Sequence, residues 1–231
     1  MADRNIIYPL TNVCITRCDV VDAIKCLSVG SAPGIDDLPA VFFKKCSNQL
    51  SVPLQSIFQK SLVQEKLPSQ WKVGKIVPIF KNKGSRSDPK NYRPVSLTSI
   101  SCKIMERILK KHMINHLLGN NLLHPGQHGF LSGKSTQTQI LECFNDWTDA
   151  IDQNKCIDVV YLDISKAFDT VSHEKLLFKM KRFGFCGPLL NWVENFLSVR
   201  SQFVQVNKDS SLKTNVTSCK QKAQLSGTEC S

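Results

Sequence analysis

The sequence predicts an α+β fold. Apolar residues recur at helical spacing in several segments that are grouped along the chain, and short β-branched or alternating runs stand between these groups. The 231 residues are 42% hydrophobic and 21% charged, which is an ordinary balance for a globular protein. A chain of this length can bury a hydrophobic core.

The N-terminal part is expected to be helical before two extended segments. Apolar residues follow helical spacing over 38–67, and Pro53 is expected to interrupt that helix. Pro78 has no N–H for a strand ladder, which suggests an edge strand. In order, the expected elements are a helix at 19–27, a turn at 31–37, the interrupted helix at 38–67, a strand at 75–80, a polar basic loop at 81–91 and an extended segment at 93–97.

Two longer helices follow. The first is expected at 100–119, where Gly119 can end it. The second is expected at 136–154, with Thr136 as its cap. The first has an apolar face of Ile104, Met105, Ile108, Leu109 and Met113, and the second has one of Ile140, Phe144, Trp147 and Ile151.

The remaining elements begin with a β-branched run. The stretch CIDVVYL at 156–162 is typical of a central strand. Two helices are expected at 173–183 and 187–199, since Gly184 and Gly187 separate them. Alternating residues at 201–207 predict a last strand.

Positive charge is concentrated in one part of the chain. The formal net charge is +11, and residues 60–111 hold thirteen Lys and Arg against three acidic residues, a net charge of +10. Localised charge of this kind usually meets a polyanion, most often a phosphate backbone. A solvated basic face is the alternative interpretation.

The ten cysteines form no C-x-x-C pair, and none has a His at ligand spacing. We therefore expect a reducing compartment and no structural metal. Cys26, Cys143 and Cys156 lie within apolar patterns, where Cys acts as a small hydrophobe. The N-terminal MADRNIIYPL has no apolar signal core, and no run approaches 18 apolar residues. The expected protein is intracellular, either cytoplasmic or nuclear, and not in a membrane.

The stretch HGFLSGKST at 128–136 raises the question of a nucleotide-binding P-loop. That loop has the pattern G-x-x-x-x-G-K-[ST] and follows a strand. His128 stands where the first Gly is required, and the residues before it have turn chemistry. A P-loop is therefore disfavoured.

The chemistry of the chain is concentrated in VVYLDISKAFDTV at 159–171. Here an apolar strand is expected to deliver Asp163 at its end, where an unpaired carboxylate is costly. Carboxylates hold the Mg²⁺ ions that neutralise charge in phosphoryl transfer. From spacing alone, a metal-binding Asp163 and one that caps the next turn fit equally well.

Four motifs resemble one known family. VVYLDISKAFDTVSHEKLL resembles the first catalytic motif of reverse transcriptases of non-LTR (LINE-type) retrotransposons. SAPGIDDLPAVFFK resembles the family's N-terminal motif, and LPSQWKVGKIVPIFKNKGSRSDPKNYRPVSLTSISCKIMERIL resembles its finger motifs. HPGQHGFLSGKSTQTQIL is similar to the segment Q-x-G-F-R-x-G-x-S-T. The motifs stand in family order over roughly residues 20–218, so HGFLSGKST is interpreted as a finger–palm connector.

The resemblance implies roles for palm residues. Asp163 matches the catalytic, metal-binding Asp, and Ile164 would offer its backbone carbonyl to the second metal position. Phe168 matches the bulky residue beneath the sugar that selects deoxynucleotides, with an ordinary core residue as the alternative. Asp169 is expected to cap the following helix rather than bind metal.

It also implies roles for finger residues. Arg93 in NYRPVSL matches the Arg that grips the incoming triphosphate, with Lys81 or Lys83 as its partner. An Arg fork suits a phosphate, although Arg93 could instead contact the template backbone. Leu131 replaces an Arg of the family's G-F-R segment, so one polar contact is lost.

The implied fold is fingers plus a partial palm of a right-hand polymerase. Residues 1–18 would be a flank, 19–155 the fingers, 156–218 a partial palm and 219–231 a divergent tail. The implied activity is RNA-directed DNA synthesis, with Mg²⁺ as cofactor and with an RNA template, a DNA primer and deoxynucleoside triphosphates as partners. Non-catalytic nucleic-acid binding is the alternative.

The resemblance stops near Val216. The family continues with a G-S-V-L-G loop and an Asp pair that supplies more metal ligands, and these do not follow here. A shifted reading frame of 222–227 can encode Gly-Ser-Val-Ile-Gly, by frameshift or by chance codon degeneracy. We therefore expect an inactive chain whose strand at 201–207 lacks partners and whose strand at 156–163 promotes association.

Overall fold

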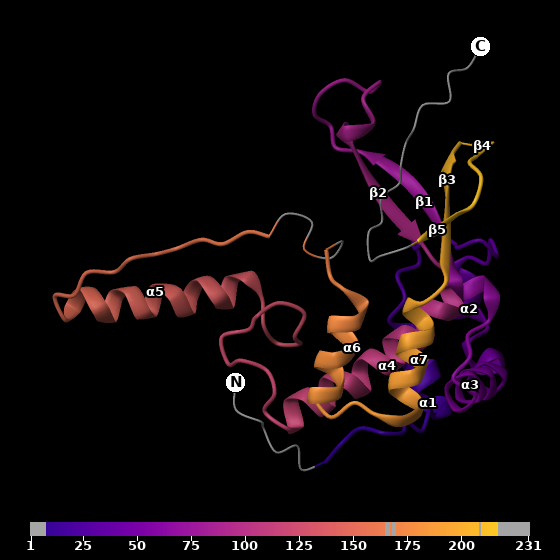
Figure 1. The fold of residues 1–231 in the computed structure, drawn as a ribbon, viewed down its shortest axis with the longest axis horizontal. Coiled ribbons are helices and arrows are strands. Elements are labelled where there is room, and N and C mark those ends of the chain that lie inside the picture. The colour runs from indigo at the N-terminus through magenta and orange to yellow at the C-terminus, as the bar shows by residue number, and fades with distance from the viewer. Residues whose placement is uncertain (1–7, 165–166, 168–169, 208, 217–231) are drawn as a thin grey trace.

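The computed structural model describes residues 8–164, 167, 170–207 and 209–216 (Figure 1). It confirms an α+β fold in which most helices pack on one another at one end of a small mixed sheet. The helices within these residues are α1 (Arg17–Lys25), α2 (Ala40–Lys45), α3 (Ser47–Val63), α4 (Ile100–Gly119), α5 (Thr136–Asp152), α6 (His173–Arg182) and α7 (Gly187–Leu197), with short 3₁₀ turns at Ser69–Lys72 and Pro89–Asn91. The strands are β1 (Val73–Phe80), β2 (Tyr92–Leu97), β3 (Arg200–Val206), β4 (Asp209–Ser210) and β5 (Thr214–Val216).

The sheet is built around β1 and β3. β2 pairs antiparallel with β1 in the register Lys75 to Leu97 through Phe80 to Tyr92. β3 pairs parallel with β1 on the other side, but only along Val73–Ile76. The edge position predicted from Pro78 therefore holds only for the outer half of β1, where the strand has β2 alone as its neighbour.

The strand β3 contradicts the expectation that it would lack partners. Its other side pairs antiparallel with β5 at one end and with β4 at the other. Both short strands come from the chain that follows directly after β3, and sequence alone did not indicate them because each is only two or three residues long. β3 is therefore an interior strand.

The hydrophobic core lies mainly among the helices. α1 packs against α3 and α4, and α7 packs against α3 and α6. Trp192 Nε1 donates to Ser61 Oγ at 3.0 Å, which satisfies the buried indole. The largest fully buried side chains are Phe58, Phe185, Ile15, Ile24, Leu62, Ile76, Ile100, Ile104, Met105 and Leu189. The core thus joins α1, α3, α4 and α7, elements that are distant in sequence.

Two details of the helices differ from the prediction. The interruption in 38–67 falls at Cys46, between α2 and α3, and Pro53 lies inside α3. Burial of Leu54 and Phe58 on the same helix outweighs the local cost of the proline, because tertiary packing can override propensity. Gln64 ends α3.

Side-chain caps fix the helix starts. Ser135 caps α5 in a capping box with Thr138, one residue before the expected Thr136. Ser172 caps α6 by accepting from Lys175 N, in the role predicted for Asp169. Asp169 itself lies outside the described residues. Hydroxyl side chains thus take both capping roles.

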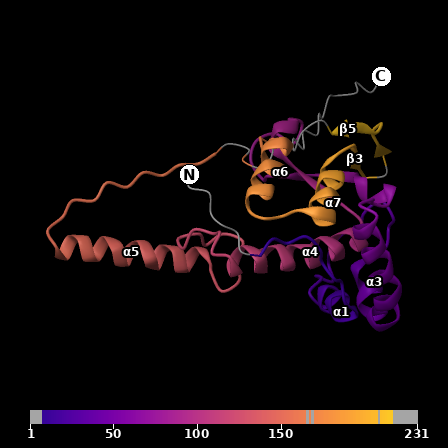
Figure 2. The same ribbon diagram turned by 60° about the horizontal axis from the view of Figure 1, so that its bottom comes forward.

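The segment 156–162 is the main departure from the sequence prediction. It runs as extended chain without a strand partner among the described residues, and its side chains are exposed. Strand propensity does not make a strand when no neighbour offers its N–H and C=O groups. The preceding helix α5 projects away from the rest of the molecule in both ribbon views (Figures 1 and 2).

The cysteines also depart from expectation. Cys26 and Cys156 are exposed and Cys143 is half-buried, so the apolar pattern around them does not place them in the core. Of the cysteines that the structure describes, Cys102 alone is buried, and all of them are free thiols: Cys14, Cys18, Cys26, Cys46, Cys102, Cys143, Cys156 and Cys186. No helix in the described part of the chain is long and apolar enough to cross a membrane.

A thiol and a carboxyl pair within α4, near the charge of Arg200 at the start of β3. Cys102 Sγ donates to Glu106 Oε1 at 3.1 Å. Burial raises the pKa of the Glu106 carboxyl, while the Cys102 hydrogen bond and the nearby charge of Arg200 oppose that rise. Arg200 is itself held by Phe196, whose ring lies 4.6 Å from the guanidinium and whose carbonyl accepts at 3.1 Å.

Glu106→Gln is expected to flatten the pH dependence of stability. A carboxyl whose pKa is raised on folding stabilises the fold below its unfolded pKa, and this contribution is lost as pH rises through the higher folded pKa. Urea unfolding from about pH 4.5 to pH 8, a window that starts near the unfolded pKa of Glu, should show a steeper fall for the wild-type chain than for Glu106→Gln. The exposed Glu174→Gln should keep the wild-type slope. Equal slopes for wild type and Glu106→Gln would contradict this role.

Candidate nucleic-acid interface

The β1–β2 hairpin is held by its own loop. Lys81 N donates to Asn91 O at 2.8 Å, so the ladder continues past the end of β1. Asn91 Nδ2 donates to Ser85 O at 2.8 Å, and Asp88 accepts from Lys90 N at 2.9 Å. Gly84 has a φ of +80°, and a Cβ there would meet the Asn91 side chain at 2.5 Å, so this turn requires glycine. The loop is therefore a fixed structure.

Five cations project from this hairpin. Two aromatic rings lie where the strands meet the loop, because Phe80 and Tyr92 pair across the strands with ring centres 5.3 Å apart. Tyr92 Oη donates to Arg86 O at 2.9 Å, and the Arg86 guanidinium lies 5.5 Å from the Phe80 ring centre. The exposed cationic side chains are Lys81, Lys83, Arg86, Lys90 and Arg93, which we call the hairpin cations. They give the hairpin a high local positive charge.

The structure brings the three predicted finger residues to this hairpin. Arg93 stands opposite Ile79 in the strand register, and Lys81 follows Ile79 by two residues. The pleat therefore places the side chains of Arg93, Ile79 and Lys81 on one face of the hairpin. Lys83 follows in the connecting loop. Lys81 Nζ donates to Lys90 O at 2.6 Å, which leaves its positive charge uncompensated. Arg93 and its expected lysine partners are thus neighbours on one element.

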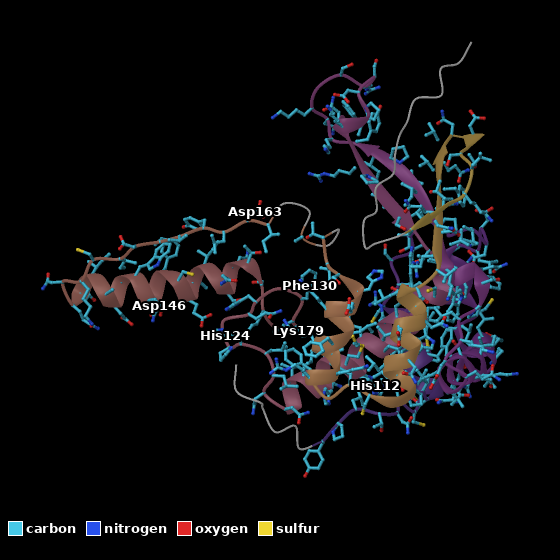
Figure 3. The ribbon with its side chains drawn as sticks, in the orientation of Figure 1. His112, His124, Phe130, Asp146, Asp163 and Lys179 are labelled. Atoms are coloured by element: carbon cyan, nitrogen blue, oxygen red, sulfur yellow. The ribbon has the colours of Figure 1, made fainter. Side chains whose placement is uncertain are left out.

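The predicted palm residues lie elsewhere. Asp163 and Ile164 stand on the extended segment before α6, where both side chains are exposed. Figure 3 shows Asp163 on the extended segment that runs back along α5, which is a different element from the β1–β2 hairpin of Figure 1. Phe168 lies outside the described residues. Among the described residues, no ion pair or hydrogen bond joins Asp163 to Arg93, Lys81 or Lys83.

The donor set near Asp163 does not fit a two-ion Mg²⁺ centre. Such a centre holds both the attacking and the leaving oxygen, and it needs several carboxylates held together. Among the described residues, no group of three or more His, Cys, Asp or Glu side chains is placed to hold a metal. Asp163 and the Ile164 carbonyl would provide one carboxylate and one neutral oxygen.

The segment 124–135 is a connector that a histidine ties to α5. His128 is buried, its Nδ1 lies 2.8 Å from Thr138 Oγ1, and its Nε2 hydrogen-bonds to the Glu142 carboxylate. Lys134 Nζ, the lysine that a P-loop would offer to phosphate, donates to Pro125 O. Irregular chain rather than a strand precedes the segment, so the P-loop interpretation is excluded on structure as well as on spacing.

Arg86 and Lys90 were missed as individual site residues. The charge of 60–111 included them, but the family motif gave them no role. Their place on the same hairpin as Arg93 follows from the hydrogen bonds of the loop, which the sequence does not show. The spacing S-x-x-D-P-K-N contained a usable signal, because Asp before Pro favours a capped turn.

Comparison with known proteins identifies the family. The family model for reverse transcriptase (RNA-dependent DNA polymerase) matches residues 79–228. The chain is 29% identical over 194 residues to the probable RNA-directed DNA polymerase from transposon BS of Drosophila melanogaster. The match covers 84% of this chain and 21% of that protein. It is 31% identical over 193 residues to the RNA-directed DNA polymerase from mobile element jockey of the same organism, with the same coverage of 84% and 21%.

A third relative is the retrovirus-related Pol polyprotein from type-1 retrotransposable element R2 of Popillia japonica. It is 28% identical over 194 residues, and the match covers 82% of this chain and 26% of that protein. The chain therefore spans only about a fifth to a quarter of the length of these curated relatives. Since the family model matches well over half of its residues, the chain belongs to the reverse transcriptase family, among the RNA-directed DNA polymerases of non-LTR retrotransposons.

Proposed function

We propose that this chain supplies the fingers and the first palm elements of an RNA-directed DNA polymerase. The hairpin cations carry the proposal, because five exposed positive side chains on one fixed hairpin suit a phosphate backbone or a triphosphate. In this assignment residues 19–155 form the fingers and 156–218 the partial palm, with 1–18 and 219–231 as flank and tail. The pairing of β1 with β3 would join the two parts in one sheet.

The finger residues then have distinct roles. Arg93 offers a planar fork of donors that matches phosphate oxygens, whereas Lys81 and Lys83 offer point charges. An RNA template, a DNA primer and a deoxynucleoside triphosphate are the partners that this chemistry serves. The resemblance would give Asp163 and the Ile164 carbonyl to Mg²⁺, the family's implied cofactor, and Phe168 to the sugar, but these two donors alone do not fit a two-ion centre.

We further propose that these 231 residues alone bind nucleic acid without polymerising. Asp163 stands on an exposed segment apart from the hairpin, and one carboxylate does not hold two metal ions in line. Non-catalytic nucleic-acid binding is therefore the second candidate function for the isolated chain. The same hairpin supports it, because phosphate binding needs no metal.

Replacing Lys81, Lys83 and Arg93 together by Ala is expected to weaken RNA binding at least tenfold at low salt. Log affinity falls with log salt concentration, and each phosphate contact on a single strand adds about 0.7 to the steepness of that fall. Removing three contacts should therefore make the slope less steep by roughly 2. Fluorescence anisotropy with a labelled single-stranded RNA across a salt series measures both quantities.

A matched triple variant controls for the change in net charge. Lys25, Lys45 and Lys175 are exposed on α1, α2 and α6, and their replacement by Ala removes the same charge from other surfaces. That variant should keep the wild-type slope. If the two triple variants weaken binding equally, or if wild-type affinity does not change with salt, the hairpin is not the phosphate site.

A further inference from the structure

Two uncharged side chains hold the loop of the β1–β2 hairpin to its returning strand. Asn91 Nδ2 donates to Ser85 O at 2.8 Å, and Tyr92 Oη donates to Arg86 O at 2.9 Å. The two acceptor carbonyls lie on either side of the Arg86 Cα. Because each peptide unit is planar, holding both carbonyls fixes the backbone from which the Arg86 side chain projects.

The two donors are themselves fixed by the strand ladder. Asn91 O accepts from Lys81 N at 2.8 Å, and Asn91 N donates to Asp88 O at 3.0 Å. Tyr92 stands opposite Phe80 in the strand register, and their ring centres lie 5.3 Å apart. The positions of both donors therefore follow from strand pairing, and their hydrogen bonds extend that order into the loop.

This arrangement decides where two cations of the loop lie. The Arg86 guanidinium lies 5.5 Å from the Phe80 ring centre, on the face of the hairpin opposite to Arg93. Lys83 directly precedes the glycine whose Cα lies so close to the Asn91 side chain that a Cβ there would meet it at 2.5 Å. The loop thus holds positive charge beside both faces of the hairpin.

We propose that Asn91 and Tyr92 are positioning residues, which hold Lys83 and Arg86 where they bind phosphate groups without rearrangement. This inference rests on the proposed function of the hairpin as a phosphate-binding surface. Binding to a loosened loop must order its long cationic side chains, and each side chain that is immobilised weakens the affinity. Neither Asn91 nor Tyr92 carries a charge, so the geometry of the loop can be changed while its charge stays constant.

The double variant Asn91→Ala/Tyr92→Phe removes both hydrogen bonds and keeps every charge. Its Phe ring can still pair with Phe80 across the strands. At low salt it should bind single-stranded RNA about tenfold more weakly than the wild-type chain, because two loosened cations must be ordered on binding. The slope of log affinity against log salt should not change, since the same number of phosphates is contacted. Fluorescence anisotropy of the full 231-residue chain across a salt series measures both quantities.

A matched double variant and two further measurements isolate the loop. Asn48 on α3 and Tyr8 before α1 are exposed, so Asn48→Ala/Tyr8→Phe makes the same chemical changes elsewhere and should bind RNA like the wild type. Trypsin should cleave after Arg86 faster in the hairpin variant, because local opening admits the protease. Equal urea midpoints for the three proteins would show that the fold itself is intact. Tyr92→Phe alone should give the same pattern with a smaller loss of affinity.

The outcomes separate the positioning role from the proposed function. If wild-type binding depends on salt but the hairpin variant binds equally tightly, the positioning role is rejected and the phosphate site stands. A shallower salt slope in the hairpin variant would also reject it, because phosphate contacts would then be lost rather than loosened. Wild-type affinity that does not change with salt would reject the phosphate site and the positioning role together.

Discussion

A primer-extension assay of the 231-residue chain is expected to show no incorporation of deoxynucleotides above that of its own Asp163→Ala variant. In-line phosphoryl transfer with two Mg²⁺ ions needs carboxylates that hold both ions, and the described residues contain no group of three or more side chains placed to hold a metal. Loss of such a centre removes the catalytic rate enhancement as a whole, so the expected difference between the two proteins is zero within error. The assay uses an RNA template, a DNA primer and saturating Mg²⁺.

The result is informative only with bound substrate. The template–primer should first be shown to bind the chain at the assay's salt concentration, because failure to bind would also give no product. Incorporation that Asp163→Ala abolishes would establish an active polymerase and reject the binding-only proposal. Retained binding without incorporation would support it, since the hairpin and the carboxylate lie on separate elements.

Local signals explain which parts of the fold could be predicted from the sequence. α4 has the predicted bounds, and four of its five predicted face residues are buried. α6 ends just before Gly184 and α7 begins at Gly187, the two glycines that sequence alone indicates. Each of these elements forms its hydrogen bonds within a short segment, so periodicity and caps suffice. The extended segments that form β1 and β2 were also predicted, and only the loop 81–91 separates these paired strands.

Long-range pairing explains the failures. The run 156–162 has stronger strand propensity than β3, yet β3 forms the interior strand, because it lies against β1 and beside the short β4 and β5. The residues of 156–162 do not indicate whether the fold places a partner strand beside them. The same difference separates the predicted site residues. The positions of Lys81, Lys83 and Arg93 follow from the local register of the hairpin, whereas the predicted position of Asp163 requires a sheet that the described residues do not form.

Gly34→Ala is expected to destabilise the fold by about 3 kcal/mol, because overpacking and loss of a helix cap act together. A Cβ at Gly34 would lie 2.5 Å from Ser99 N and 2.6 Å from both Ser99 Cα and Thr98 C. All three are backbone atoms, so no side-chain rotation relieves the contact. Ser99 caps α4 by accepting from Cys102 N, and α4 carries a large part of the core. In a chain of this size the melting temperature should fall by roughly 6–12 °C.

Two variants separate the close approach from other effects of the substitution. A Cβ at Gly30 meets no atom within 4 Å, so Gly30→Ala should change the unfolding free energy by less than about 0.5 kcal/mol. Ser99→Ala removes the cap alone and should cost about 1 kcal/mol. Urea unfolding of the three variants should therefore rank Gly34→Ala as the most destabilised and Gly30→Ala as the least. If Gly34→Ala costs no more than Ser99→Ala, the SAPGIDD turn moves away from α4 without penalty, and the glycine of that motif is not required for packing.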